Sequence, residues 1–157
     1  MIPTIRLRPA GPSDCLRVWR WQNEKEVRAS SFNTAKIPHT THRQWFFRKL
    51  ADSASKILIA VIHKDEPIGQ VRLDRLGRSG AEIHILIKKA ARNRGYGTVL
   101  LKTAARYAFR SMSVKKLYAH IRPDNLRSLR AFEKAGFKLK RTGKVHSQKT
   151  CKLILVH

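Results

Sequence analysis

Residues 92–98 have the composition of a phosphate-binding turn. Gly95 and Gly97 lie between an apolar run that ends at Ile87 and a segment whose apolar residues recur at spacings of three and four, which predicts a strand followed by a helix. Glycine adopts backbone angles that other residues avoid, and the first N–H groups of a helix have no partner within it. Such a turn can present several donors to an anion, although two glycines alone are also ordinary turn chemistry. The turn has neither the Gly-Lys-Ser/Thr ending of a P-loop nor the third glycine of a dinucleotide fingerprint.

A second group of polar residues follows about thirty positions later. Residues 117–121 are mostly apolar and predict a strand. Asn125 then favours the capping position of a helix, and Gly136 lies where glycine commonly ends one. A second helix is therefore predicted between these two residues.

The string Asn125-x-x-Ser128-x-x-x-Phe132-Glu133-Lys134-x-Gly136-Phe137, behind Arg92-x-x-Gly95-x-Gly97, resembles the GNAT superfamily of acyl-CoA-dependent N-acyltransferases. The resemblance spans essentially the whole chain. It implies one domain over residues 1–157 of the α/β (α+β) class, with a mixed, mostly antiparallel sheet of about seven strands and helices on both faces.

The resemblance further implies acetyl-CoA as cosubstrate. The N–H groups of the 92–98 turn, aided by the charges of Arg92 and Arg94, would bind its phosphates, and the preceding strand would hold the pantetheine arm and the acyl carbonyl. Asn125 would contact a pantetheine amide, cap its helix, or do both. The implied coenzyme-binding residues are Ile85, Leu86, Ile87, Arg92, Asn93, Arg94, Gly95, Tyr96, Gly97, Thr98, Asn125, Ser128 and Phe132.

Glu82 is the leading candidate for the base that deprotonates an amine. Because side chains alternate along a strand, Glu82 and His84 share one face, and His84 could share this role. The alternative is that Glu82 only pairs with a neighbouring arginine.

The proton donor departs from the pattern of the superfamily. Many GNAT enzymes carry a tyrosine where this chain has Phe132, which cannot donate a proton. Ser128 is the substitute, either as a donor to the leaving sulfur or merely as part of the helix cap. Tyr118 and His120 are further candidates on the adjacent strand.

The N-terminal half resembles the nucleotide-amino-sugar N-acetyltransferases of pseudaminic- and legionaminic-type nonulosonate biosynthesis. That resemblance implies a nucleotide-linked amino-sugar as acceptor, with two arginines near its diphosphate. The implied acceptor-binding residues are Trp21, Arg28, Phe32, Asn33, Gln70 and Arg72. The alternative is that aromatic residues at helical spacing belong to the core, and we expect this for at least two of Trp19, Trp21 and Trp45.

The chain is strongly basic, with 34 Lys and Arg against 10 Asp and Glu and a formal charge of +24. This charge could steer anionic substrates, favour nucleic acid or a ribosome, or reflect a general bias. Because basic residues are spread along every segment and aromatic residues do not interleave with them, we favour ligand steering together with a general bias over dedicated nucleic-acid binding. The alternative functions are N-terminal acetylation of a ribosomal-type protein and a non-catalytic module that binds acyl-CoA or nucleic acid.

Composition and cysteine spacing indicate the cellular compartment of the protein and whether it binds a metal. The longest apolar run, residues 57–62, is too short to span a membrane, and the N-terminus lacks a secretory pattern. Cys15 and Cys151 fit no metal-binding spacing, so we expect a reduced, cytoplasmic protein without a metal. The sequence leaves the oligomeric state open.

The remaining elements follow from the same patterns. Strands are predicted at residues 5–8, 57–63, 68–73, 81–87, 116–121, 137–141 and 150–156. Ser13 or Asp14 is expected to cap a helical stretch, or a pair of helices, that reaches Val27, and Thr41 to cap a helix over residues 42–50. Residues 30–40 and 142–149 are predicted loops.

Overall fold

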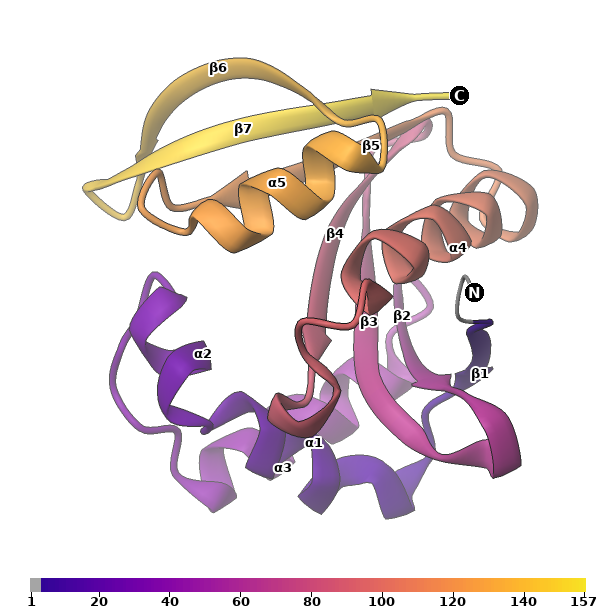
Figure 1. The fold of residues 1–157 in the computed structure, drawn as a ribbon. Helices are drawn as coiled ribbons and strands as arrows, with labels where there is room; N and C mark the ends of the chain where they lie inside the picture. Colours follow the sequence, from indigo (N-terminus) through magenta and orange to yellow (C-terminus); the bar gives the residue numbers. More distant parts are fainter. Residues whose placement is uncertain (1–3) are drawn as a thin grey trace.

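The computed structural model describes residues 4–157 (Figure 1). Its strands are β1 (Arg6–Pro9), β2 (Ser55–Val61), β3 (Pro67–Leu76), β4 (Gly80–Ile87), β5 (Lys116–Ile121), β6 (Lys138–Val145) and β7 (Gln148–Val156). Its α-helices are α1 (Cys15–Gln22), α2 (Lys25–Ser30), α3 (His39–Ala51), α4 (Tyr96–Ser111) and α5 (Leu126–Lys134). Short 3-10 turns lie at Pro12–Asp14, His63–Asp65 and Lys89–Ala91.

The seven strands form one sheet in the order β1-β2-β3-β4-β5-β7-β6. Every neighbouring pair is antiparallel except β4 and β5, which α4 connects in parallel. The predicted mixed, mostly antiparallel sheet is therefore confirmed. The parallel pairing is short, because β4 and β5 pair only from Gly80 and Lys116 to Glu82 and Tyr118. Beyond these residues the two strands have no pairing with each other, and the sheet opens between them.

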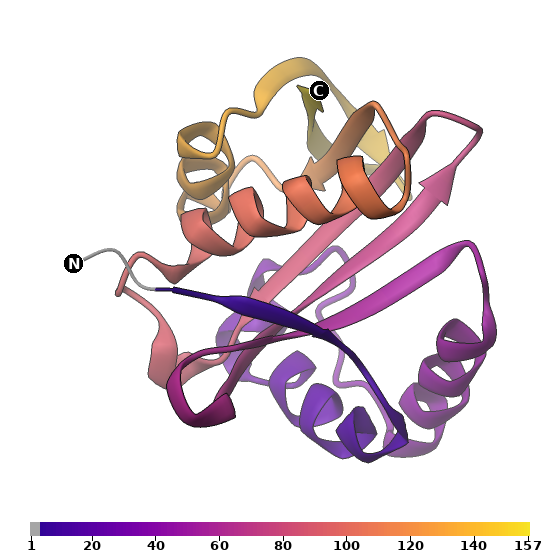
Figure 2. The ribbon, with the colours of Figure 1, turned by 90° about the vertical axis from the view of Figure 1, so that its right-hand side faces the viewer.

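Helices cover both faces of the sheet, as Figure 2 shows with α4 on one side and α1 and α3 on the other. Alternating strand residues such as Leu58 and Ile83 point to α4 and α5, where Leu100 and Leu101 are fully buried. The second core lies under α1 and α3, and its residues are Cys15, Val18, Trp21, Phe46, Ile57, Ile59, Val61 and Leu86. This second layer covers β2 to β4 and leaves the same face of β5, β7 and β6 without a helix.

The starts of α4 and α5 follow the sequence prediction. Gly95 precedes α4 with a φ of 81°, in the left-handed region where glycine is favoured. Asn125 caps α5, since its side-chain oxygen accepts from the N–H of Ser128 at 3.3 Å. Both helix starts open toward the gap between β4 and β5.

Two sequence-based boundaries were wrong. Helix α3 begins at His39, because Pro38 in extended conformation precedes it, so Thr41 lies inside the helix. Asp14 is the N-cap residue of α1, as predicted, but its side chain makes no capping bond; its carboxylate accepts instead from Arg8, Arg17 and the N–H of Gly11.

Residues 142–149 form the end of a hairpin and not a loop. His146 and Ser147 both have positive φ, at 48° and 64°, which is the backbone of a two-residue turn that continues the twist of its strands. Strand β6 is almost wholly exposed, so it carries none of the apolar alternation by which a strand is predicted.

Within residues 4–157, no helix combines the length and the apolar character needed to cross a membrane.

Candidate active site

A cavity of about 1010 Å³ lies where β4 and β5 part. It brings together the ends of both strands, the start of α4, one side of α5 and residues of α1, α2 and the segment after them. Most of the predicted coenzyme-binding residues line it, namely Ile85, Leu86, Ile87, Arg92, Asn93, Gly95, Tyr96, Gly97, Thr98, Asn125, Ser128 and Phe132. Arg94 is exposed and is not part of this lining, so the structure does not support its predicted role.

The turn before α4 offers backbone donors to the cavity. The first N–H groups of α4, from Tyr96 to Thr98, have no acceptor within the helix. A Cβ on Gly97 would stand 3.7 Å from that of Ala131, so α4 begins close against α5. These donors and the positive end of the helix make the turn suited to an anion.

Arg92 has several partners within the protein. Its Nε donates to the carbonyl of Ile87 and one terminal nitrogen to Glu24, both at 2.9 Å, while Glu26 lies 3.6 Å from the other. The guanidinium is only 11% exposed and its charge is balanced by two carboxylates. Arg92 therefore links the end of β4 to α2 and the residue before it. The backbone N–H groups then supply most of the turn's attraction for anions.

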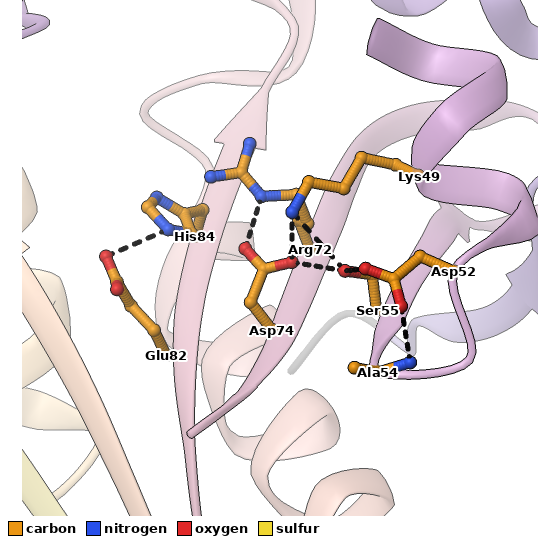
Figure 3. A network of polar contacts seen from close by, with 8 residues as sticks. All are labelled: Lys49, Asp52, Ala54, Ser55, Arg72, Asp74, Glu82 and His84. Atoms are coloured by element: carbon orange, nitrogen blue, oxygen red, sulfur yellow. Dashed lines mark hydrogen bonds and ion pairs between the residues drawn. The ribbon is translucent and has the colours of Figure 1, made fainter. Parts of the chain in front are cut away.

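Glu82 and His84 form a pair on one face of β4, as Figure 3 shows. Glu82 Oε1 lies 3.0 Å from His84 Nε2. The hydrogen bond from His84 lowers the pKa of Glu82, burial opposes this shift, and the charges of His84, His120 and Arg72 reinforce it. Of the two, only His84 lines the cavity. The carboxylate stays ionised at neutral pH and accepts from the imidazole of His84, a residue that lines the cavity.

Two buried polar atoms in the described chain lack hydrogen-bond partners, and both belong to residues that line this cavity. They are Oε1 of Gln70, a residue with 3% exposure, and Nδ1 of His120. Unpaired buried polar atoms are costly, so a polar ligand in this cavity that bonded to them would be stabilised.

The acceptor-binding predictions divide into two groups. Phe32, Gln70 and Arg72 line the cavity. Trp21 does not, because it is buried in the second core at 9% exposure. Trp45 packs against the same core, so the expectation of at least two core tryptophans is met.

Arg28 and Asn33 also lie outside the cavity lining. Arg28 donates to the carbonyls of Gln22, Asn33 and Ala35, and burial lowers its pKa. The Asn33 side chain accepts from the N–H of Ala35. Both side chains are therefore bonded to the chain around the end of α2, and their predicted contact with an acceptor stays a prediction.

Sequence reasoning missed Arg122, which holds that segment over the cavity. Its guanidinium donates to the carbonyls of Ala29 and Ser31 at 3.0 and 3.1 Å and pairs with Asp124. Gln148, at the tip of the β6–β7 hairpin, donates to the carbonyl of Phe32 from the other side. The only signal in the sequence is the Arg-Pro-Asp string after β5, which gives no hint of its distant partners.

Asp74 anchors the side of the site next to His84 (Figure 3). It accepts from Ser55 at 2.7 Å, Arg72 at 2.9 Å and Lys49 at 3.0 Å. Burial alone would raise the pKa of Asp74, but the Ser55 hydrogen bond and the two cations lower it from 3.8 to about 2. Asp74 thereby fixes one edge of Arg72, whose guanidinium also lies 5.2 Å above the Trp45 ring.

Replacing Asp74 by asparagine should destabilise the fold by about 2 kcal/mol at pH 7. A carboxylate with a lowered pKa stabilises the folded state above pH 3.8, and this contribution disappears as the pH falls toward 2. Urea unfolding at pH 7, 4 and 2 should therefore show the two proteins converging in acid. Asp65→Asn, which breaks an exposed pair with Arg6, is the matched control and should cost about 0.5 kcal/mol or less. A constant gap between wild type and Asp74→Asn from pH 7 to pH 2 would contradict this account of the network.

In the described part of the chain, no three His, Cys, Asp or Glu side chains gather as metal ligands would. Cys15 and Cys151 are both buried and free.

Residues 4–138 match the family described as "Acetyltransferase (GNAT) domain". Acetyltransferase PseH of Campylobacter jejuni subsp. jejuni serotype O:23/36 (strain 81-176) is 23% identical over 120 residues, which cover 76% of this chain and 74% of that protein. The spermidine N-acetyltransferase of Vibrio cholerae, solved with CoA and spermine, has a TM-score of 0.86 at 18% identity, covering 97% of this chain and 95% of that one. AAC(6')-Ib, solved with ribostamycin and coenzyme A, has a TM-score of 0.87 at 20% identity, covering 98% and 93%. Since the family match extends over most of its length, the chain belongs to the GNAT family of acetyltransferases.

Proposed function

We propose that this enzyme transfers an acetyl group from acetyl-CoA to the primary amine of an acceptor that carries negative charge, namely a nucleotide-linked amino-sugar. The observation that carries the proposal is the charge of the cavity lining. Its Lys and Arg residues are Arg72, Arg92, Arg122, Arg127, Arg130 and Lys134, and its carboxylates are Glu26 and Asp124.

Both carboxylates already have cationic partners. Glu26 lies 3.7 Å from Lys89 and 3.6 Å from Arg92, and Asp124 lies 2.6 Å from Arg122. Spermine and ribostamycin, found in two structural neighbours, carry several amines. In the described lining of this cavity, Arg127, Arg130 and Lys134 have no carboxylate partner, so such a polycation would meet unpaired cations and no unpaired carboxylate. An anionic acceptor fits this field, and a nucleotide-linked amino-sugar is the anionic acceptor that the resemblance of the N-terminal half implies.

Binding of the coenzyme depends on backbone N–H donors of the cavity. The first N–H groups of α4 would hold phosphates, and Arg127, Arg130 and Lys134 line the same cavity from α5. Residues 85–87 of β4 have no pairing with β5, so an extended arm can lie along them. One N–H of this stretch would hold the acyl carbonyl oxygen, a contact worth about 3 kcal/mol in the transition state.

Deprotonation of the acceptor amine depends on the Glu82–His84 pair. Because an ionised carboxylate can only accept, the hydrogen of their bond belongs to His84 Nε2. In the neutral ring this leaves Nδ1 as a proton acceptor. We assign His84 as the base that faces the acceptor and Glu82 as the residue that orients it, which modifies the sequence prediction that Glu82 acts first.

Two residues of the cavity are candidates to protonate the leaving sulfur. Phe132 is 2% exposed, lines the cavity and packs edge-on against Phe137. Ser128 lines the cavity one helical turn earlier, and its N–H is occupied by the Asn125 cap while its hydroxyl remains available to the sulfur. His120, with an unpartnered Nδ1, is the second candidate.

A panel of acceptors tests the proposal. The enzyme would be incubated with acetyl-CoA and nucleotide-linked amino-sugars, spermidine, an aminoglycoside or basic peptides, and products would be weighed by mass spectrometry. We expect acetylation of at least one nucleotide-linked amino-sugar and little of the polycations. Efficient acetylation of peptide N-termini without any of the sugars would replace this proposal with N-terminal protein acetylation.

A further inference from the structure

The uncovered half of the sheet carries a group of residues that the proposed mechanism does not use. Tyr118 on β5 lies beneath two lysines from neighbouring strands, Lys140 on β6 and Lys152 on β7. The Nζ atoms stand 5.5 Å and 4.6 Å from the centre of the tyrosine ring. We call Tyr118, Lys140 and Lys152 the lysine–tyrosine cluster.

The charge of this cluster is not balanced locally. Among residues 4–157, neither lysine lies within ion-pair distance of a carboxylate, whereas Lys49, Lys88 and Lys89 all do. Two ammonium groups that face one ring repel each other, and the ring offsets only part of this cost. A bound dianion would remove the repulsion.

The cluster adjoins the reacting groups. Tyr118 pairs in register with Glu82 across the β4–β5 step, and Lys152 pairs with His120, which lines the cavity. Paired residues on neighbouring strands project from the same face of the sheet, about 5 Å apart. Lys152 therefore lies on the face of the sheet that presents Glu82 and His84, and Lys140 reaches the same face because its Nζ stands over the Tyr118 ring.

We propose that the lysine–tyrosine cluster is the anion subsite of the acceptor, and that Lys140 and Lys152 bind its phosphate groups while its amine lies at His84. Lysine is an effective point-charge partner for phosphate, and the tyrosine hydroxyl can donate a further hydrogen bond. In this proposal the subsite takes the role that the sequence assigned to Arg28, because the Arg28 guanidinium donates to the backbone carbonyls of Gln22 and Asn33. The assignment of the anion to the acceptor rests on the proposed function.

The test uses inorganic pyrophosphate as probe and isothermal calorimetry as readout, with saturating CoA to occupy the phosphate-binding turn. Lys140→Gln and Lys152→Gln should each weaken pyrophosphate binding about tenfold, and the double variant more. Lys56→Gln is the matched control, because Lys56 is an exposed lysine on β2 at the other end of the sheet. It removes the same charge and should change the affinity less than twofold. Citrate in place of pyrophosphate distinguishes a carboxylate from a phosphate as the preferred anion.

Equal pyrophosphate affinity in the double variant and in Lys56→Gln would overturn the subsite. With an acceptor in hand, the double variant should raise KM for the phosphorylated acceptor and leave kcat and CoA affinity unchanged. If no anionic acceptor is acetylated, the proposed function fails, yet the pyrophosphate titration still decides whether the subsite exists.

Discussion

Replacing His84 by glutamine should lower kcat by about 10²–10⁴-fold, with little change in the affinity for CoA. An amine is mostly protonated at neutral pH, so the reaction needs a group that removes the proton. His84 lines the cavity and is oriented by Glu82 at 3.0 Å, and glutamine keeps the approximate size of the side chain without its basic nitrogen. Steady-state kinetics across pH would measure the loss.

Two further variants separate catalysis from structure. Glu82→Gln should also lose activity chiefly in kcat and shift the acid limb of the pH–rate profile, because an amide no longer holds the imidazole as a carboxylate does. His63→Gln changes an exposed histidine in the β2–β3 turn and should behave as wild type. A His84→Gln enzyme with unaltered kcat at every pH would remove the pair from the mechanism.

Replacing Gly95 by valine should weaken CoA binding by roughly ten- to a hundredfold or more. The residue has a φ of 81°, and a β-branched side chain held there is strained by about 1–3 kcal/mol, so the turn must change its path. Any such change moves the N–H donors at the start of α4 together. Calorimetric titration with CoA would give the affinity.

Gly77 offers a matched control for this variant. It also has positive φ, at 64°, and a Cβ at either glycine would meet no atom within 4 Å. Gly77 lies in the β3–β4 turn, outside the cavity lining, so Gly77→Val should bring similar backbone strain but normal CoA binding. Equal CoA affinity in both valine variants would show that the phosphates bind elsewhere.

The parts of this fold that sequence reasoning predicts well are those fixed by neighbouring residues. The 3.6-residue periodicity after Gly97 predicts α4, and the cap of α5 depends on Asn125 and Ser128 alone, three positions apart. Glu82 and His84 are two positions apart on one strand, so their shared face follows from strand geometry.

The parts that were missed depend on distant partners. Arg92 looks like a phosphate ligand until Glu24, 68 positions away, is found beside it. Arg28 looks like a free cation until the segment after α2 folds over its guanidinium. The lysine–tyrosine cluster comes from three strands, and no local pattern marks it.

The most direct test of the proposed selectivity compares one amino-sugar with and without an attached nucleotide diphosphate. The amino-sugar that the enzyme acetylates best would be assayed with and without its nucleotide diphosphate, at low salt and with saturating acetyl-CoA. Charge-assisted hydrogen bonds of about 1.5–3 kcal/mol each predict that kcat/KM is about a hundredfold higher, or more, for the diphosphate-linked sugar. Equal kcat/KM values, or a preference for the uncharged sugar, would contradict the claim that this cavity selects anionic amines.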